Sequence, residues 1–177
     1  MSDSVMVWVF VAVLLFWSMG AYNRLVRLRS HGISGFATLE GFLTQYVAMV
    51  KTNLPAVDGG CSEAWLGLAA ASDQFTACLK VVQAKPLNGP AMQTLQTALE
   101  TLTLCWSRLR DLPPDLAGSA LPVTLQTQWE NVAMQAEVAR TEFNKRVEIY
   151  NEAIHQFPAL LLAWVFGFKP AMPIEVR

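Results

Sequence analysis

Hydrophobic residues recur along most of the chain in alternating steps of three and four, the spacing of one face of an α-helix. A strand would need steps of two, so the pattern predicts an all-α fold. Four segments carry it: from Leu25 to Asn53, from Ser62 to Pro86, from Asn88 to Pro113 and from Leu121 to Phe157. Because short connections between long helices favour antiparallel neighbours, we predict an antiparallel, up-down-up-down four-helix bundle.

The last of these segments has the longest regular pattern in the chain. Its predicted seam consists of Leu125, Trp129, Val132, Ala136, Ala139, Phe143, Val147, Tyr150, Ile154 and Phe157. Such a seam predicts one continuous helix in which Trp129, Phe143 and Tyr150 are buried on the same face.

The segment from Val5 to Tyr22 is apolar and carries no charge. At about 1.5 Å per residue a helix of this length reaches roughly 27 Å, close to the hydrocarbon thickness of a bilayer. Trp8, Trp17 and Tyr22 lie towards its ends, where amphipathic rings favour the membrane interface. We therefore predict a transmembrane anchor over residues 1–22 and a helical domain over residues 23–177, with the anchor and the first bundle helix forming one rod.

The charges around the anchor predict its direction. Arg24, Arg27 and Arg29 follow it, whereas Asp3 precedes it. Basic residues stay on the cytoplasmic side, so we expect the bundle in the cytoplasm and the amino terminus outside. The same charge order argues against a signal peptide, which needs a basic leader, although the small residues from Ser18 to Ala21 resemble a cleavage site and leave processing as an alternative.

The apolar stretch from Ala159 to Phe168 is too short to span a membrane. In an up-down bundle the last helix returns towards the anchor, so we expect this stretch near Leu25, Leu28 and Gly32. Two interpretations stay open: an interfacial element, with Trp164 and Lys169 at headgroup level, or a plug for the end of the bundle.

Composition narrows the range of functions. The 177 residues carry 13 basic and 14 acidic side chains, a net charge of −1 that does not favour nucleic acid. The three cysteines, Cys61, Cys78 and Cys105, form no CxxC and are predicted to be buried, reduced thiols. Because His31 and His155 lie far apart in the sequence, we predict no metal. The sequence has no Gly-rich phosphate loop, and we predict no cofactor.

The fourth helical segment also has a charged face, which contains Glu130, Glu137, Arg140, Glu142, Asn144, Lys145, Arg146, Glu148 and Asn151. A solvated face is the ordinary interpretation. Asn144 and Asn151 lie seven residues apart beside the seam, so a polar contact that fixes helix register is a second role. Glu152 and His155 have the spacing of a di-iron motif, but no second Glu-x-x-His pair accompanies them.

Glycines at positions 32, 35 and 41 fall inside the first bundle helix, where each costs up to about 1 kcal/mol relative to alanine. Close approach of a neighbouring helix is one explanation, and a hinge between anchor and bundle is the other.

Two groups of residues towards the ends of the chain have a characteristic order and spacing. They are Tyr22, Asn23, Arg24, Leu25, Val26, Arg27, Leu28 and Arg29, and then Ala139, Arg140, Phe143, Asn144, Val147, Tyr150, Asn151, Phe157, Pro158, Ala163, Phe166, Gly167 and Phe168. These positions resemble the LemA family of bacterial membrane-anchored proteins. Residues 45–55 depart from the family pattern, because Lys51 is their one charged residue where the family has a further basic and acidic stretch, which marks a divergent member. The resemblance implies an amino-terminal anchor, a helical bundle and no established enzymatic activity.

These patterns together predict a non-enzymatic helical module, tethered by a single span to the bacterial inner membrane. We expect it to act as a scaffold or adaptor with the lipid bilayer and another membrane protein as partners. The alternative is a sensor or ligand-binding bundle. An interior cavity with convergent polar groups would favour the alternative, and a filled interior with an exposed apolar patch would favour the adaptor.

Overall fold

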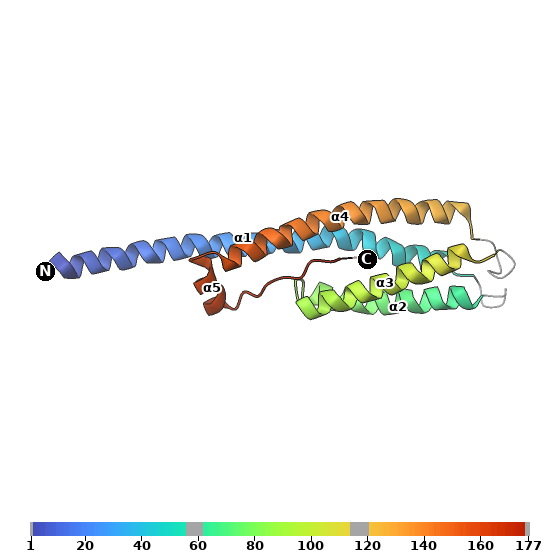
Figure 1. Cartoon of the computed structure of the whole chain (residues 1–177), viewed down its shortest axis with the longest axis horizontal. Helices are drawn as coiled ribbons and strands as arrows, with labels where there is room; N and C mark the ends of the chain where they lie inside the picture. Colours follow the sequence, from blue (N-terminus) through green and yellow to red (C-terminus); the bar gives the residue numbers. More distant parts are fainter. Residues whose placement is uncertain (1, 56–61, 114–120, 176–177) are drawn as a thin grey trace.

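The computed structural model describes residues 2–55, 62–113 and 121–175. Its regular structure over these residues consists of five helices and no strand (Figure 1). They are α1 (Ser2–Asn53), α2 (Glu63–Ala84), α3 (Gly89–Asp111), α4 (Val123–His155) and α5 (Ala159–Phe166). The predicted all-α fold is confirmed, and the bounds of α2, α3 and α4 lie within two residues of the predicted ones.

Helices α1 to α4 form the expected up-down-up-down bundle. In Figure 1, α1 and α3 run away from the amino terminus, and α2 and α4 run back towards it. α1 packs mainly against α4, and α2 packs mainly against α3. The anchor and the first bundle helix are one rod, because α1 continues for 52 residues, about 78 Å at 1.5 Å per residue.

The helical seams form the core of the bundle. The residues at three-four spacing on α2 and α3 are all buried: Trp65, Leu68, Ser72, Phe75, Leu79 and Val82 on α2, and Met92, Leu95, Leu99, Leu102, Trp106 and Leu109 on α3. Trp129, Phe143 and Tyr150 are buried on α4 as predicted. Phe157 is the exception, because α4 ends at His155 and the ring is 74% exposed. Its predicted place in the buried seam is therefore wrong.

The buried face of α1 is wider than the three-four spacing predicts, because that spacing accounts for two columns of residues along the helix. Besides Leu25, Leu39 and Tyr46, it buries Phe36 and Leu43, which form a third column one position further round the helix. The reason is that α1 contacts both α4 and α2, so its apolar face must cover two neighbours.

The amino-terminal part of α1 extends beyond the bundle as an isolated helix (Figure 1). Its large apolar side chains are exposed to solvent, and Trp8, Phe10 and Phe16 among them are 65–81% exposed. Within the described residues α1 is the one helix long and apolar enough to cross a membrane, and its most apolar window is not covered by protein. Such a surface is stable in lipid and unfavourable in water, so the chain is a membrane-associated helical protein.

α5 lies at the anchor end of the bundle, as the up-down order predicts. The ring of Phe166 packs against Tyr22 with centroids 4.8 Å apart, and the exposed Phe157 packs against Trp17 at 5.8 Å. Gly32, which was expected beside α5, instead faces the Leu87 side chain. Both interpretations of this stretch stay open, because Ala159, Ala163 and partly Leu162 pack against the end of the bundle, whereas the other large side chains of α5 are exposed.

The glycines of α1 have different neighbours. An added Cβ at Gly35 would lie 2.9 Å from Cδ of Arg146, whereas one at Gly41 would meet nothing within 4 Å. Close approach therefore explains Gly35. Of the cysteines, Cys78 and Cys105 are free and half-buried, less buried than predicted, and Cys61 lies outside the described residues.

Candidate functional site

Helices α3 and α4 leave a groove between them. α3 packs along α2, and α4 packs along α1. α3 and α4 approach each other through large side chains such as Trp106 and Trp129, whose rings stack with centroids 4.1 Å apart. The residues after α5 enter this groove. Gly167 ends α5 in the left-handed conformation with φ of 69°, which glycine adopts without strain, and the chain then turns back along α4.

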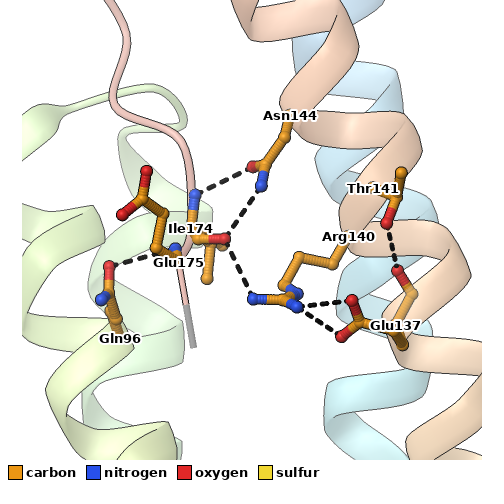
Figure 2. Close-up of polar contacts among 7 residues, drawn as sticks. All are labelled: Gln96, Glu137, Arg140, Thr141, Asn144, Ile174 and Glu175. Carbon is orange, nitrogen blue, oxygen red and sulfur yellow. Dashed lines mark hydrogen bonds and ion pairs between the residues drawn. The ribbon is translucent and has the colours of Figure 1, made fainter. Parts of the chain in front are cut away.

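Residues 169–175, here called the docked segment, run without regular secondary structure between α3 and α4 (Figure 2). Ala171 and Ile174 are buried in the groove, with 5% and 1% of their surfaces exposed. The docked segment therefore occupies the space that a direct α3–α4 contact would fill in a closed bundle.

Two asparagines of α4 hold the backbone of the docked segment. Asn144 Nδ2 donates to the carbonyl of Ile174 at 2.9 Å, and its Oδ1 accepts from the Ile174 N–H at 2.9 Å. Asn151 makes the same pair of bonds with Ala171, both at 2.8 Å. Each amide thus satisfies both backbone groups of one residue, as an adjacent strand would.

The spacing of the two pairs follows from helix and extended-chain geometry. Seven residues of helix between Asn144 and Asn151 rise about 10.5 Å. Three residues of extended or polyproline-type chain between Ala171 and Ile174 cover roughly 9–10 Å. Pro170 directly precedes Ala171, as a proline precedes Ile174, so the docked segment repeats every three residues.

Further groups fix the two ends of the docked segment. The Tyr150 hydroxyl donates to the carbonyl of Lys169 at 3.0 Å, and Arg140 Nη1 donates to Ile174 O at 3.5 Å. On the α3 side, Gln96 Oε1 accepts from the N–H of Glu175 at 3.3 Å (Figure 2). The contacts bind backbone atoms, so they impose little requirement on the side chains of the bound segment.

Charge in the groove is balanced locally. Arg140, whose side chain is 17% exposed, pairs with the more exposed Glu137 one turn earlier. Burial raises the pKa of Tyr46 to about 12, and the nearby Glu137 carboxylate adds to this effect. Burial also raises the pKa of Tyr150, against the opposing effect of Arg29. Both phenols therefore stay protonated at neutral pH, and Tyr150 keeps the proton that it donates to the docked segment.

A cavity of about 180 Å³ continues the groove beside Ile174. Its walls are mostly apolar and come from α1, α3, α4 and the docked segment, and they include Leu39, Leu43, Leu95, Leu99, Ala133 and Ala136. Gln96, Thr103 and Arg140 add polar atoms. This volume exceeds the roughly 150 Å³ that holds benzene and is below the roughly 300 Å³ of the smallest typical ligand pockets, so it suits one apolar side chain.

The structure brings together part of the predicted residue set. Arg140, Asn144, Tyr150 and Asn151 all contact the docked segment. The expected role of the two asparagines in helix register is wrong, because their partners belong to the docked segment and not to another helix. Arg146, from the same charged face, donates to the carbonyl of His31 and thereby joins α4 to α1.

The remaining predicted residues gather at the membrane end or stay apart. Phe166 and Phe168 surround Tyr22, and Phe157 contacts Trp17. The side chains that remain on the surface are those of Trp8, Asn23, Arg24, Arg27, Arg29, Trp164 and Lys169. No three His, Cys, Asp or Glu side chains among the described residues lie close enough to hold a metal.

Sequence reasoning missed Gln96, Ala171 and Ile174. Gln96 carries no distinguishing signal. The other two follow the prolines of a three-residue repeat, and that repeat matches in length the seven-residue separation of Asn144 and Asn151. A comparison of the two spacings would have indicated the contact.

The helices and the groove define a membrane-associated helical bundle that binds its own extended segment through backbone hydrogen bonds. The LemA family model matches residues 68–177, which include Arg140, Asn144, Tyr150, Asn151 and the docked segment. The chain belongs to the LemA family. None of the curated proteins compared with the chain matches it.

Proposed function

We propose that this chain is a non-enzymatic, membrane-tethered adaptor whose α3–α4 groove binds an extended segment of another membrane protein. The observation that carries the proposal is the pairing of Asn144 and Asn151 with the backbone of the docked segment. These amides recognise an extended chain whatever its sequence, which is the chemistry of strand-addition peptide recognition.

In this proposal the partner's segment and the chain's own docked segment compete for the same groove. The partner contributes two backbone residues to Asn144 and Asn151, three positions apart, and places an apolar side chain in the cavity beside Ile174. The single span restricts the search to proteins of the same membrane, which raises their effective concentration at the groove. The arginines after the anchor support a bundle on the cytoplasmic face of a bacterial inner membrane.

Photo-crosslinking in intact membranes tests the adaptor. A photoreactive residue at Thr103, on the wall of the cavity, should capture a defined membrane protein. The matched control places the same residue at Met134, which is 67% exposed on α4 and does not line the cavity. The adduct at position 103 should disappear with excess synthetic peptide of residues 169–177, and also in the double variant Asn144→Ala/Asn151→Ala.

Two results would contradict the adaptor. One is an adduct at position 103 that persists unchanged with the peptide and in the double variant. The other is cross-linking from Thr103 to copies of this chain alone, because it would make the groove a site of self-association.

The second candidate function is a ligand-binding bundle, which the cavity beside Ile174 favours. Its volume of about 180 Å³ limits the ligand to a small, mostly apolar molecule. Native mass spectrometry of the full chain released from membranes distinguishes the two functions. A stoichiometric small molecule that is lost on cavity filling at Ala136 would support the ligand-binding bundle instead of the adaptor.

A further inference from the structure

α5 exposes nearly all of its large side chains. Ala159 and Ala163, four residues apart on one face, are its buried positions. The outward side chains are those of Leu160, Leu161, Trp164, Val165 and Phe166, which are 51–83% exposed. The helix contains no charged residue. A continuous apolar surface of this kind marks contact with another apolar phase.

The position of α5 indicates which phase that is. α5 and the turn before it contact α1 from Trp17, which Phe157 touches, to Tyr22, which Phe166 touches. These five residue steps span about 7.5 Å along the helix axis. These are the last residues of the membrane span. Helices that lie in a bilayer surface enter the headgroup and acyl boundary by about 5–10 Å, so α5 is at the matching depth.

The orientation of α5 fits the same location. Figure 1 shows α5 lying across the direction of α1 instead of alongside it. A helix perpendicular to a spanning helix lies parallel to the bilayer plane. Next to it, a groove of about 490 Å³ between α1 and the α4–α5 turn is lined by Phe16, Trp17, Gly20, Phe157 and other apolar positions, with Arg24 as its charged wall. Acyl chains would fill the apolar part, and Arg24 would face lipid phosphate.

We propose that α5 is an in-plane membrane helix that inserts its outward side chains into the leaflet from which α1 emerges. The surface of α5 is continuous with the exposed apolar surface of the anchor, through the contacts of Phe157 with Trp17 and of Phe166 with Tyr22. The exposed cations Arg27 and Lys169 lie near this level and meet the headgroups. The bundle is thereby held at two points and stands upright on the membrane.

A depth-sensitive fluorophore tests this contact in the full chain. Val165→Cys and Val138→Cys provide matched attachment sites, because the two valines are 64% and 68% exposed. Serine replaces Cys61, Cys78 and Cys105 in both chains. The labelled proteins are reconstituted into vesicles of phosphatidylethanolamine and phosphatidylglycerol, and their helix content is compared by circular dichroism.

The label at position 165 should emit in the blue and be quenched by phospholipid that carries a nitroxide near the top of the acyl chain. The label at position 138 should resemble a label in water. If both labels behave as in water, α5 does not enter the membrane and the proposal is overturned. If the blue emission at position 165 falls as protein is diluted with lipid, a second copy covers α5, and the proposal is again overturned.

Unlabelled protein gives an independent measure. Trp164 is 83% exposed and Trp129 is 5% exposed. Trp164→Phe should therefore remove tryptophan emission that brominated lipid quenches, whereas Trp129→Phe should remove emission that brominated lipid leaves unchanged. Equal quenching in Trp164→Phe and the parent chain would contradict the lipid contact. This result does not depend on the adaptor, because neither tryptophan pairs with the docked segment.

Discussion

At the scale of single residues, Asn144 and Asn151 give the surface of α4 the same hydrogen-bonding groups as the edge of a β-strand. A primary amide has one donor and one acceptor side, and these match the carbonyl and N–H of an extended residue. The prolines before Ala171 and Ile174 have no N–H to donate. The N–H groups of Ala171 and Ile174 themselves donate to the asparagine side chains.

Asn151→Ala removes two hydrogen bonds and leaves the N–H and C=O of Ala171 without them. At about 1 kcal/mol net per bond, we expect a loss of about 2 kcal/mol in the free energy of docking. Amide hydrogen exchange should accelerate at residues 171 and 174 while the α1–α4 core stays protected, because the segment detaches locally. Asn23→Ala, at an exposed position of α1, is the control. Unchanged exchange at both residues would show that the asparagines do not hold the segment.

Gly35 and Gly41 provide a matched pair on one helix. Replacement of either by alanine gains up to about 1 kcal/mol of helix propensity. Gly41→Ala should realise this gain, since no atom lies within 4 Å of the added Cβ. Gly35→Ala should fall short, because the Cβ displaces Arg146 from its bonds to Ser34 Oγ and His31 O. Thermal unfolding measures the stability of both variants. An equal rise in Tm for the two would show that Arg146 moves without a loss of stability.

At the scale of the elements, the three-four spacing predicted α2, α3 and α4 together with their buried seams. Helical period and burial are local consequences of sequence, so Trp129, Phe143 and Tyr150 were placed correctly. The third column of α1, with Phe36 and Leu43, depends on how many helices surround it, which is a property of the assembly.

The candidate site was predicted in part. Asn144 and Asn151 stand out as polar groups beside a seam, but their partners lie 30 and 20 residues further along the chain, respectively. Those partners lie in the docked segment, which has no regular secondary structure, so they do not show the three-four spacing of a helix. Contacts between an irregular segment and a helix depend on the fold, so the spacing of residues within one helix cannot indicate them.

The separation of α3 and α4 leaves the cavity beside Ile174, and filling it tests its role. Ala136→Leu adds roughly three carbon atoms to a buried wall of the cavity. We expect the free energy of unfolding to rise by about 1 kcal/mol, as for other cavity-filling changes. Cross-linking from Thr103 to the partner should fall at the same time.

Val138→Leu, on an exposed part of α4, is the control and should change neither quantity. A destabilised Ala136→Leu chain would mean that the cavity walls cannot accept the added carbons. A stabilised chain that still cross-links fully to the partner would place the partner's contact outside the cavity.

At the scale of the whole molecule, the helix directions tie the ends of the structure together. α4 returns to the anchor, α5 crosses it, and the docked segment then runs back along α4 (Figure 1). The bundle, α5 and the groove consequently have a fixed position relative to the anchor helix.

The direction of the anchor is the last prediction. Arg24, Arg27 and Arg29 are exposed on α1 immediately after the span, and Lys169 adds a fourth exposed cation in the segment that follows α5. Each favours the cytoplasmic side, since basic residues near a span resist translocation. A carboxyl-terminal fluorescent protein that folds only in the cytoplasm should therefore emit, and alkaline phosphatase at the same position should be inactive.

Replacement of the three arginines by glutamine, together with two lysines added before Asp3, should move a measurable fraction of the phosphatase fusion into its active state. Glutamine substitutions at Lys80 and Lys85, exposed on and just after α2, remove charge elsewhere and should leave the orientation unchanged. Strong phosphatase activity in the parent chain would place the bundle outside the cytoplasm and reverse the assignment.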